Sequence, residues 1–187
     1  MAEPRVNEPR SKGPLRVLVL GASGSLGAVI AARLHAAGHV VIGASRRRGE
    51  AFARWSDYGW IRADLSADES VSAWRPRLYA IDVVVNAALI AREARSGQFE
   101  ATLATGSSRL YAACAQFAVA RVIHLIDLGW RGGETAKRIA AARVAEHALG
   151  VNHLDASVVE IAPDESAEHV AARVAGHLDD TLARLAA

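Results

Sequence analysis

The segment Leu15–Ala37, with the sequence LRVLVLGASGSLGAVIAARLHAA, decides the fold of this chain. The apolar run that ends at Leu20 predicts a buried strand. Three glycines spaced three apart follow directly, and a helical pattern of apolar residues comes after them. A strand, a glycine turn and an amphipathic helix in this order are typical of a segment that binds a dinucleotide.

The glycine turn supplies the first candidate binding residues. Glycine allows backbone angles that are closed to other residues, and it lets the main chain approach a pyrophosphate closely. The free N–H groups and the dipole at the start of the next helix then favour the phosphate charge. The alternative is an ordinary tight turn between a strand and a helix. On the first interpretation, the residues that contact the cofactor are Gly21, Ser23, Gly24, Ser25, Leu26 and Gly27.

Length and composition indicate one globular domain. The chain has 187 residues, of which 51% are hydrophobic, and this length suits a single core. We expect residues 14–187 to form that domain, behind a disordered tail, residues 1–13, that has little to bury. No metal site is expected.

Charge and cysteine content limit the partners. The net charge is only +2 and no basic block is long, which argues against nucleic acid as the main partner. No stretch is long and apolar enough to cross a membrane, and the N-terminus lacks the apolar core of a signal peptide. The single cysteine, Cys114, fits a reducing compartment. We therefore expect a cytoplasmic protein that acts on a small molecule.

Strands and helices alternate along the rest of the chain. Such alternation, with continuously apolar strands, predicts an α/β fold: a doubly wound parallel sheet (the Rossmann fold) with helices on both faces and the strand order 3-2-1-4-5-6. After the first strand, the predicted strands are residues 40–42, 60–63, 81–85, 121–126 and 156–161. The predicted helices after the first are residues 50–58, 68–78, 99–117 and 134–149, and a last one with an apolar stripe over 170–185 that docks on the sheet. Residues 89–98 are expected to form a loop over the site.

Ligands of such sheets bind beyond the carboxyl ends of the strands. The sequence places polar or small residues at these ends, and together they form the predicted site. These strand ends are Gly21, Ser45-Arg46, Asp64-Leu65, Asn86-Ala87-Ala88 and Asp127-Leu128.

Four features of the sequence together resemble the short-chain dehydrogenase/reductase superfamily, and especially its extended and atypical branches. They are the glycine turn, Asp64-Leu65, Asn86-Ala87-Ala88, and Val122-Ile123-His124-Leu125 in the fifth strand. The resemblance covers about residues 15 to 161. It implies that Asp64 and Leu65 meet the adenine, and that Asn86, Ala87 and Ala88 line the adenine ribose and the cofactor channel. The alternatives are a turn cap for Asp64 and a bond between neighbouring strand-end loops for Asn86.

The end of the second strand indicates which dinucleotide binds. An acidic residue there would bind the ribose 2′-hydroxyl and repel a 2′-phosphate. This chain has Ser45 instead, followed by Arg46 and Arg47, and a guanidinium binds a phosphate with two hydrogen bonds. NADP(H) is therefore favoured over NAD(H). The alternative is a solvated basic loop.

The catalytic pattern of the superfamily is missing. Most members use a Tyr-x-x-x-Lys pair in the helix after the fifth strand, with a serine or threonine just after that strand. Here Tyr58, Tyr79 and Tyr111 are the only tyrosines, and Arg138 or Ile139 falls where the tyrosine belongs. The serine position falls on Ile126 or Asp127.

Three functions fit this pattern: a small atypical NADPH-dependent reductase, a dinucleotide-binding sensor or scaffold without turnover, and a non-redox lyase or cyclase. The titratable candidates for catalysis are Asp127 and Lys137, whereas His124 is expected to be a packed core histidine. Few residues follow the sixth strand. The substrate pocket would therefore come from residues 91–98, from residues 128–134, or from the second subunit of a homodimer.

Overall fold

The computed structural model describes residues 13–46, 59–67, 70–129 and 134–185. Its centre is a parallel sheet of six strands in the order β3-β2-β1-β4-β5-β6, so the predicted doubly wound sheet is confirmed. The strands are β1 (Arg16–Leu20), β2 (Val40–Ser45), β3 (Gly59–Arg62), β4 (Val83–Asn86), β5 (Arg121–Asp127) and β6 (Ala156–Ile161). The predicted tail before residue 13 and the predicted helix 50–58 lie outside the described residues.

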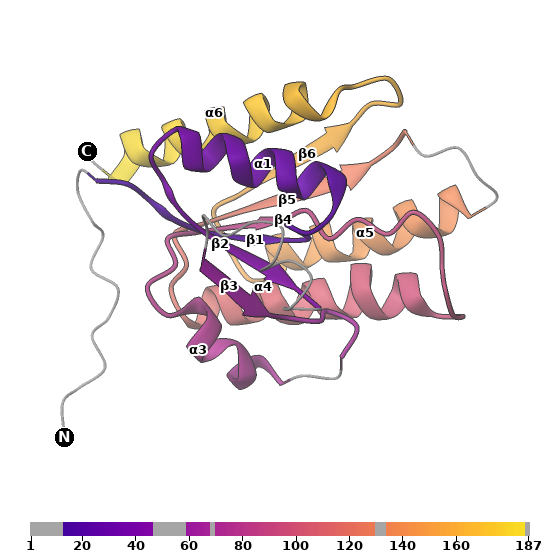
Figure 1. The fold of residues 1–187 in the computed structure, drawn as a ribbon. Helices are drawn as coiled ribbons and strands as arrows, with labels where there is room; N and C mark the ends of the chain where they lie inside the picture. Colours follow the sequence, from indigo (N-terminus) through magenta and orange to yellow (C-terminus); the bar gives the residue numbers. More distant parts are fainter. Residues whose placement is uncertain (1–12, 47–58, 68–69, 130–133, 186–187) are drawn as a thin grey trace.

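The sheet is buried on both faces because β1 from Val17 to Leu20 and β4 from Val83 to Val85 are continuously apolar. In β1, Val17 and Val19 face one layer of helices while Leu18 and Leu20 face the other, and all four are at most 2% exposed. One face is covered by α1 (Ser25–Ala36) and α6 (Ala167–Leu185). The other is covered by α4 (Ser107–Gln116) and α5 (Thr135–Val151), with the short α3 (Arg75–Leu78) beside them (Figure 1).

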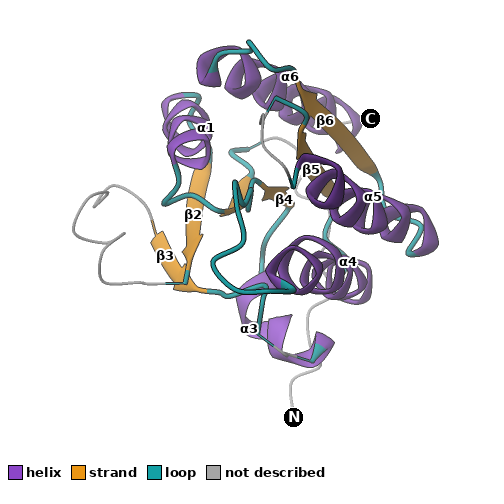
Figure 2. Cartoon of the chain, turned by 90° about the vertical axis from the view of Figure 1, so that its right-hand side faces the viewer, coloured by secondary structure: helices purple, strands orange, loops and turns teal. Residues whose placement is uncertain are grey.

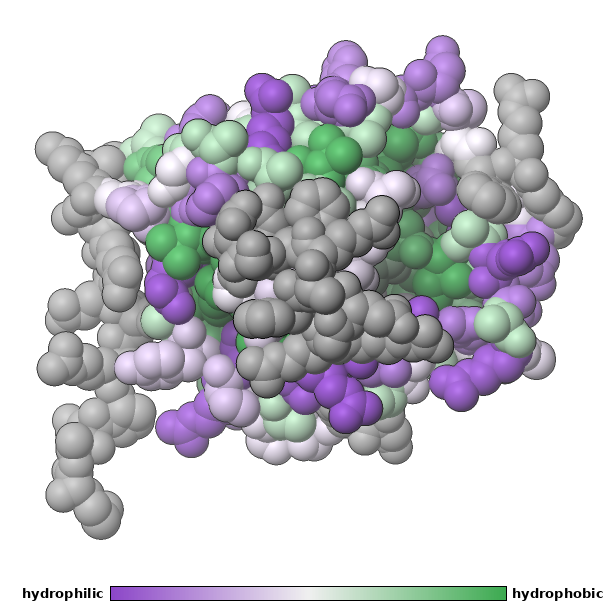
Figure 3. All heavy atoms as spheres, in the orientation of Figure 1, coloured by the Kyte–Doolittle hydropathy of each residue, from purple (hydrophilic) through white to green (hydrophobic). Residues whose placement is uncertain are grey.

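The last helix docks as predicted. Val170, Val174 and Leu178 are fully buried against α1 and the sheet, and Leu182 and Leu185 pack at the margin of the same core. The outer side of this layer carries the hydrophilic side chains seen along the top of Figure 3. Within the described residues, no helix is both long and apolar enough to span a membrane.

Two predicted helices differ from the observed ones. The region 68–78 contains a 3₁₀ turn, η1 (Val71–Trp74), followed by the four-residue α3. The predicted helix 99–117 is not one α-helix, because its first part, η2 (Glu100–Gly106), is a π-helix that continues into α4. A Cβ on Gly106 would lie 1.9 Å from the carbonyl oxygen of Leu65, so this wide segment presses directly against the end of β3. Apolar periodicity cannot distinguish these helix types.

Candidate functional site

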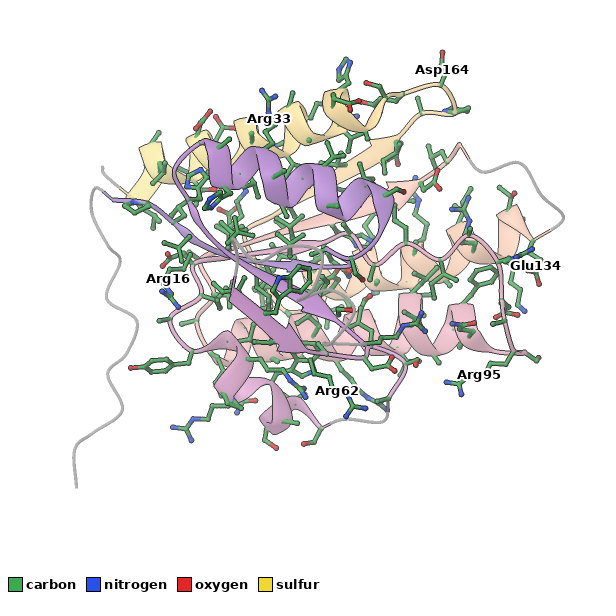
Figure 4. The ribbon with its side chains drawn as sticks, in the orientation of Figure 1. Arg16, Arg33, Arg62, Arg95, Glu134 and Asp164 are labelled. Atoms are coloured by element: carbon green, nitrogen blue, oxygen red, sulfur yellow. The ribbon has the colours of Figure 1, made fainter. Side chains whose placement is uncertain are left out.

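A cavity of about 560 Å³ opens at the carboxyl ends of the strands. Figure 2 views the molecule from this side, where the loops after the strands gather between α1 and α5. In Figure 4, Glu134 and Asp164 mark this edge, and Arg16, at the start of β1, lies at the opposite end. The predicted site residues that line the cavity are Gly21, Ser23, Gly24, Ser25, Leu26, Gly27, Ser45, Arg46, Asp64, Leu65, Ala87, Ala88 and Asp127.

Three predicted site residues are placed differently. Asn86 lines a second, much smaller cavity of about 10 Å³ that adjoins the first. Arg47 lies outside the described residues. Lys137 is not among the described residues that line either cavity. Topology therefore brings most of the predicted residues together, and their contact with a cofactor stays a prediction.

The glycine turn is shaped by close backbone contacts. Gly21 has a φ of +76°, and a Cβ there would lie 2.3 Å from the carbonyl oxygen of Ala87. A Cβ on Gly27 would lie 2.1 Å from the carbonyl oxygen of Gly21. These two glycines are required by the protein's own packing. Gly24, in contrast, is exposed, and among the described residues beyond its chain neighbours only the Gly21 carbonyl oxygen lies within 4 Å of its Cβ position, at 3.2 Å.

The first turn of α1 has the features of an anion-binding helix end. Gly24 is the N-cap residue and makes no side-chain capping bond, and the first turn contains no acidic residue. The first N–H groups of a helix have no partner within the helix, and they carry the positive end of its dipole. Backbone N–H groups, the small side chains of Ser23 and Ser25, and the wall of the cavity therefore fit a pyrophosphate.

The ends of β2 and β3 form the adjoining wall. The Ser45 hydroxyl donates to the Ser23 hydroxyl at 3.2 Å, which joins the end of β2 to the glycine turn. Arg46 is exposed at the rim of the cavity. The Asp64 carboxylate accepts from both the N–H and the hydroxyl of Ser66, at 2.9 and 2.7 Å. Asp64 thus caps a turn, as the alternative interpretation proposed, while it also lines the cavity.

Asn86 belongs to a buried hydrogen-bond network. Its Nδ2 donates to the hydroxyls of Ser107 and Tyr111 at 3.0 and 2.9 Å, and its Oδ1 accepts from the N–H of Ala88 at 3.3 Å. The Tyr111 hydroxyl lies 2.7 Å from Nδ1 of His124, and Nε2 of His124 lies 3.2 Å from the carbonyl oxygen of Ala142. The Asn86 side chain therefore joins the end of β4 to α4.

The hydrogen-bond partners of His124 show which of its ring nitrogens carries the proton. A carbonyl oxygen only accepts, so the neutral His124 ring carries its proton on Nε2, and Nδ1 accepts from the Tyr111 hydroxyl. Burial lowers the pKa of His124 to about 4 and raises the pKa of Tyr111 well above its ordinary value. His124 is 4% exposed and is therefore a packed core histidine, as expected.

This network predicts acid sensitivity. Because the unfolded His124 binds a proton near pH 6.5 and the folded one only near pH 4, the unfolded chain takes up the extra proton between these values. We expect the free energy of unfolding to fall by up to about 3 kcal/mol as the pH drops through this window. In urea titrations, the free energy of unfolding of His124→Gln should depend less on pH than that of the wild type. The exposed His147→Gln is the control, and equal slopes for wild type and His124→Gln would contradict the prediction.

Asp127 is held in place by two donors. Its Oδ2 accepts from Nη1 of Arg138 at 2.8 Å, and its Oδ1 accepts from the N–H of Gly129 at 2.8 Å. The side chain of Arg138 is 4% exposed and that of Asp127 is 20% exposed. Arg138 occupies one of the two positions where the superfamily's tyrosine would fall. The structure thus puts a buried ion pair at the predicted catalytic end of the cavity.

Lys137 has a different environment. Its side chain is 53% exposed, and its Nζ donates to Glu93 at 2.6 Å. The other Glu93 oxygen accepts from the N–H of Phe99 at 2.7 Å. The hydrogen bond between the two side chains raises the pKa of Lys137 and lowers the pKa of Glu93. This pair ties the connection after β4 to α5, and the structure does not bring Lys137 into the lining of the site.

Sequence reasoning missed one wall of the cavity. The connection after β6 and the start of α6 contribute Ala162, Pro163, Glu165, Ala167 and Val170. The Glu165 side chain is 10% exposed, and its carboxylate forms an ion pair with Arg173, with Oε1 lying 2.9 Å from Nη1. The signal was available, since the carboxyl end of a sixth parallel strand must lie at the same edge as the others. The second subunit of a homodimer, expected as one possible source of the substrate pocket, stays a prediction.

Comparison with known proteins identifies the family. Residues 17–126 match the model of the NAD dependent epimerase/dehydratase family. A search of curated proteins finds no match. A protein from Bacillus halodurans that is described as an NAD-dependent epimerase/dehydratase is 19% identical, with a TM-score of 0.77 over 89% of each chain.

Two other solved structures are similar. The oxidoreductase ylbE from Lactococcus lactis is 14% identical, with a TM-score of 0.73 over 89% of this chain and 86% of that one. The Bordetella bronchiseptica enzyme WbmH, in complex with NAD⁺, is 17% identical with a TM-score of 0.61, over 80% of this chain but only 57% of that one. This chain thus spans little more than half the length of WbmH. At such identities the structures share the fold.

The family match covers β1, the glycine turn and the ends of β2, β3 and β4, which line much of the larger cavity, whereas Asp127 and the wall after β6 lie outside the match. The resemblance to short-chain dehydrogenases/reductases is confirmed by this match and by the shared NAD(P)-binding Rossmann fold. This chain belongs to the NAD dependent epimerase/dehydratase family.

Proposed function

We propose that this protein binds NADP(H) and reduces a small organic substrate without the Tyr-x-x-x-Lys pair of its superfamily. The observation that carries the proposal is the end of β2, where Ser45 and Arg46 line the cavity beside the glycine turn. A carboxylate at this strand end would repel a 2′-phosphate, whereas a hydroxyl and a guanidinium attract it. When bound, the reduced cofactor supplies a hydride.

The residues fit this cofactor along the whole cavity. The backbone of the glycine turn and the open end of α1 would hold the pyrophosphate, and Arg46 would meet the 2′-phosphate. Asp64 and Leu65 would lie at the adenine, with Ala87 and Ala88 along the channel. Asp127 would lie at the nicotinamide end, where chemistry takes place.

Arg46→Ala tests the cofactor preference. We expect the variant to lose about 1–3 kcal/mol of NADPH binding, which is roughly a 5- to 150-fold higher Kd, because a charge-assisted pair is lost. NADH binding should change little, since NADH has no 2′-phosphate. Titrations followed by nicotinamide fluorescence measure both constants.

The control is Arg33→Ala, which removes an arginine on the outer side of α1 that points away from the sheet (Figure 4). It changes the net charge by the same amount, so it reports any general electrostatic effect. Equal wild-type affinities for NADPH and NADH would contradict the proposed preference. An equal loss of NADPH affinity in Arg46→Ala and Arg33→Ala would also contradict it.

A dinucleotide-binding sensor without turnover is the second candidate. It is favoured by the environment of Asp127, whose two oxygens already accept hydrogen bonds from Arg138 and Gly129. A panel of aldehydes and ketones distinguishes the candidates: a reductase consumes NADPH with at least one of them, whereas a sensor binds NADPH and consumes none. Turnover that leaves the cofactor neither oxidised nor reduced would indicate a non-redox lyase or cyclase instead.

A further inference from the structure

We propose that Arg138 binds the uncharged carbonyl oxygen of the substrate, in the small cavity beside Asp127. This inference rests on the proposed function, because it assigns the substrate class of the same site. It makes Arg138 the catalytic residue that stabilises the substrate oxygen, and Asp127 the positioning residue that acts through it.

Arg138 is fixed from one side only. It lies in the first turns of α5 and is 3% exposed. Its Nη1 donates to Asp127, which is itself held by the N–H of Gly129. The guanidinium is planar, so this contact fixes the direction of its remaining N–H groups.

The opposite edge of the guanidinium has no partner. Within the described residues, Nε and Nη2 of Arg138 are both buried and neither makes a hydrogen bond. These two nitrogens carry N–H groups that point the same way from one edge, so they can converge on a single oxygen. Buried donors are almost always satisfied. An acceptor from outside the chain would complete this edge.

The space beside Arg138 has the size of one oxygen-bearing group. The cavity that Arg138 lines measures about 10 Å³, which is about the space that one water needs. It adjoins the cofactor cavity, because Ala88, Leu89, Ile90 and Asp127 line both. A substrate in the larger cavity could therefore reach Arg138 with one oxygen while the rest of the molecule stays outside.

The ion pair between Arg138 and Asp127 favours a substrate oxygen without charge. The charge of Arg138 is already balanced by Asp127, so a substrate carboxylate would leave a net negative charge in a buried space. A carbonyl oxygen enters without charge. On reduction, the carbonyl carbon receives a hydride with its electron pair, the π pair moves to the oxygen, and the oxygen then takes a proton from water. The guanidinium stabilises the charge that develops on the oxygen and keeps all its own protons.

A binding experiment tests the contact without turnover. The Nε–H of an arginine is visible in ¹H–¹⁵N spectra, and the Arg138 signal is assigned by its loss in Arg138→Lys. The full-length protein saturated with NADPH is titrated with isobutyramide, whose carbonyl does not accept a hydride, and separately with isobutyrate as its charged counterpart. We expect a saturable shift of the Arg138 signal with the amide and none with the carboxylate.

Kinetics test the role in catalysis. With any carbonyl compound that the wild type reduces, Arg138→Met should lower kcat by roughly 100- to 1000-fold, as the loss of one oxyanion donor does. The Kd of NADPH should stay within about twofold, since Arg138 is not among the described residues that line the cofactor cavity. Arg138→Lys keeps the charge but lacks the adjacent Nε–H and Nη2–H donors. We therefore expect its kcat to lie between those of Arg138→Met and the wild type.

The outcomes separate this inference from the function on which it rests. A saturable shift with isobutyrate would overturn the carbonyl assignment and indicate a carboxylate site. No shift with either probe while NADPH binds would also overturn it and indicate a buried water at this edge. A protein that fails to bind NADPH overturns the proposed function instead. In that case the same titrations of the free protein decide whether Arg138 binds a carbonyl. The spectra of the wild type give this answer even if the Arg138 variants fail to fold.

Discussion

Gly24→Val is expected to raise the Kd of NADPH by at least about 100-fold while the protein remains folded. Gly24 is exposed at the entrance of the cavity, in an extended conformation that valine adopts readily, with φ −82° and ψ 166°. Its side chain would project into the space where the backbone N–H groups of α1 meet the pyrophosphate. Isothermal titration measures the loss, and thermal unfolding shows whether the fold is intact.

The other two glycines of the turn should behave differently. Valine at Gly21 or Gly27 would place its Cβ 2.3 or 2.1 Å from a backbone oxygen, so we expect these variants to unfold at much lower temperature. The control is Gly150→Val in α5, where no described residue outside its own stretch of helix lies within 4 Å of the Cβ position. Wild-type affinity in a folded Gly24→Val protein would show that the turn is only structural.

Asp127→Asn should have the second-largest effect, lowering the reductase rate by about 10²–10³-fold, as the loss of one oxyanion donor does, because Asp127 positions Arg138. Asparagine keeps the shape of the side chain but removes its negative charge. Arg138 would then lose its counter-ion, and its guanidinium would no longer be held in one direction. The rate with a carbonyl substrate and the Kd of NADPH are measured together, and the Kd is expected to change little.

The matched controls are the tyrosines. There is no tyrosine from Ala112 to Ala187, and Tyr111 is fully buried in the network with Asn86 and His124. Changing Tyr58, Tyr79 and Tyr111 singly to phenylalanine should leave the rate within a few-fold. Tyr111→Phe should instead lower stability by about 1–3 kcal/mol, because it leaves buried polar atoms unpaired. A tyrosine variant that loses 100-fold in rate while binding NADPH would overturn the assignment of Asp127.

The position of the larger cavity was predictable because it follows from local patterns. The run before Gly21 and the apolar runs of the later strands fix a parallel sheet, and the carboxyl ends of parallel strands meet at one edge. Ser45, Asp64, Ala87 and Asp127 could therefore be placed together from their order in the chain alone. The tight glycines followed from the same motif, although the atoms that exclude their side chains belong to the protein's own backbone.

Tertiary structure decided which side chains lie at the predicted catalytic end of the cavity. Lys137 and Arg138 are neighbours in the sequence, yet α5 turns Lys137 outward to Glu93 and Arg138 inward to Asp127. Titratable side chains in a sequence do not show which ones are buried, since burial depends on the rotation of the helix against the sheet. The π-helix before α4 and the wall after β6 also depend on contacts between distant segments. The sequence by itself determined the sheet and the edge at which the larger cavity opens. Packing determined which side chains face that edge, because only the folded chain brings together residues that are far apart in sequence.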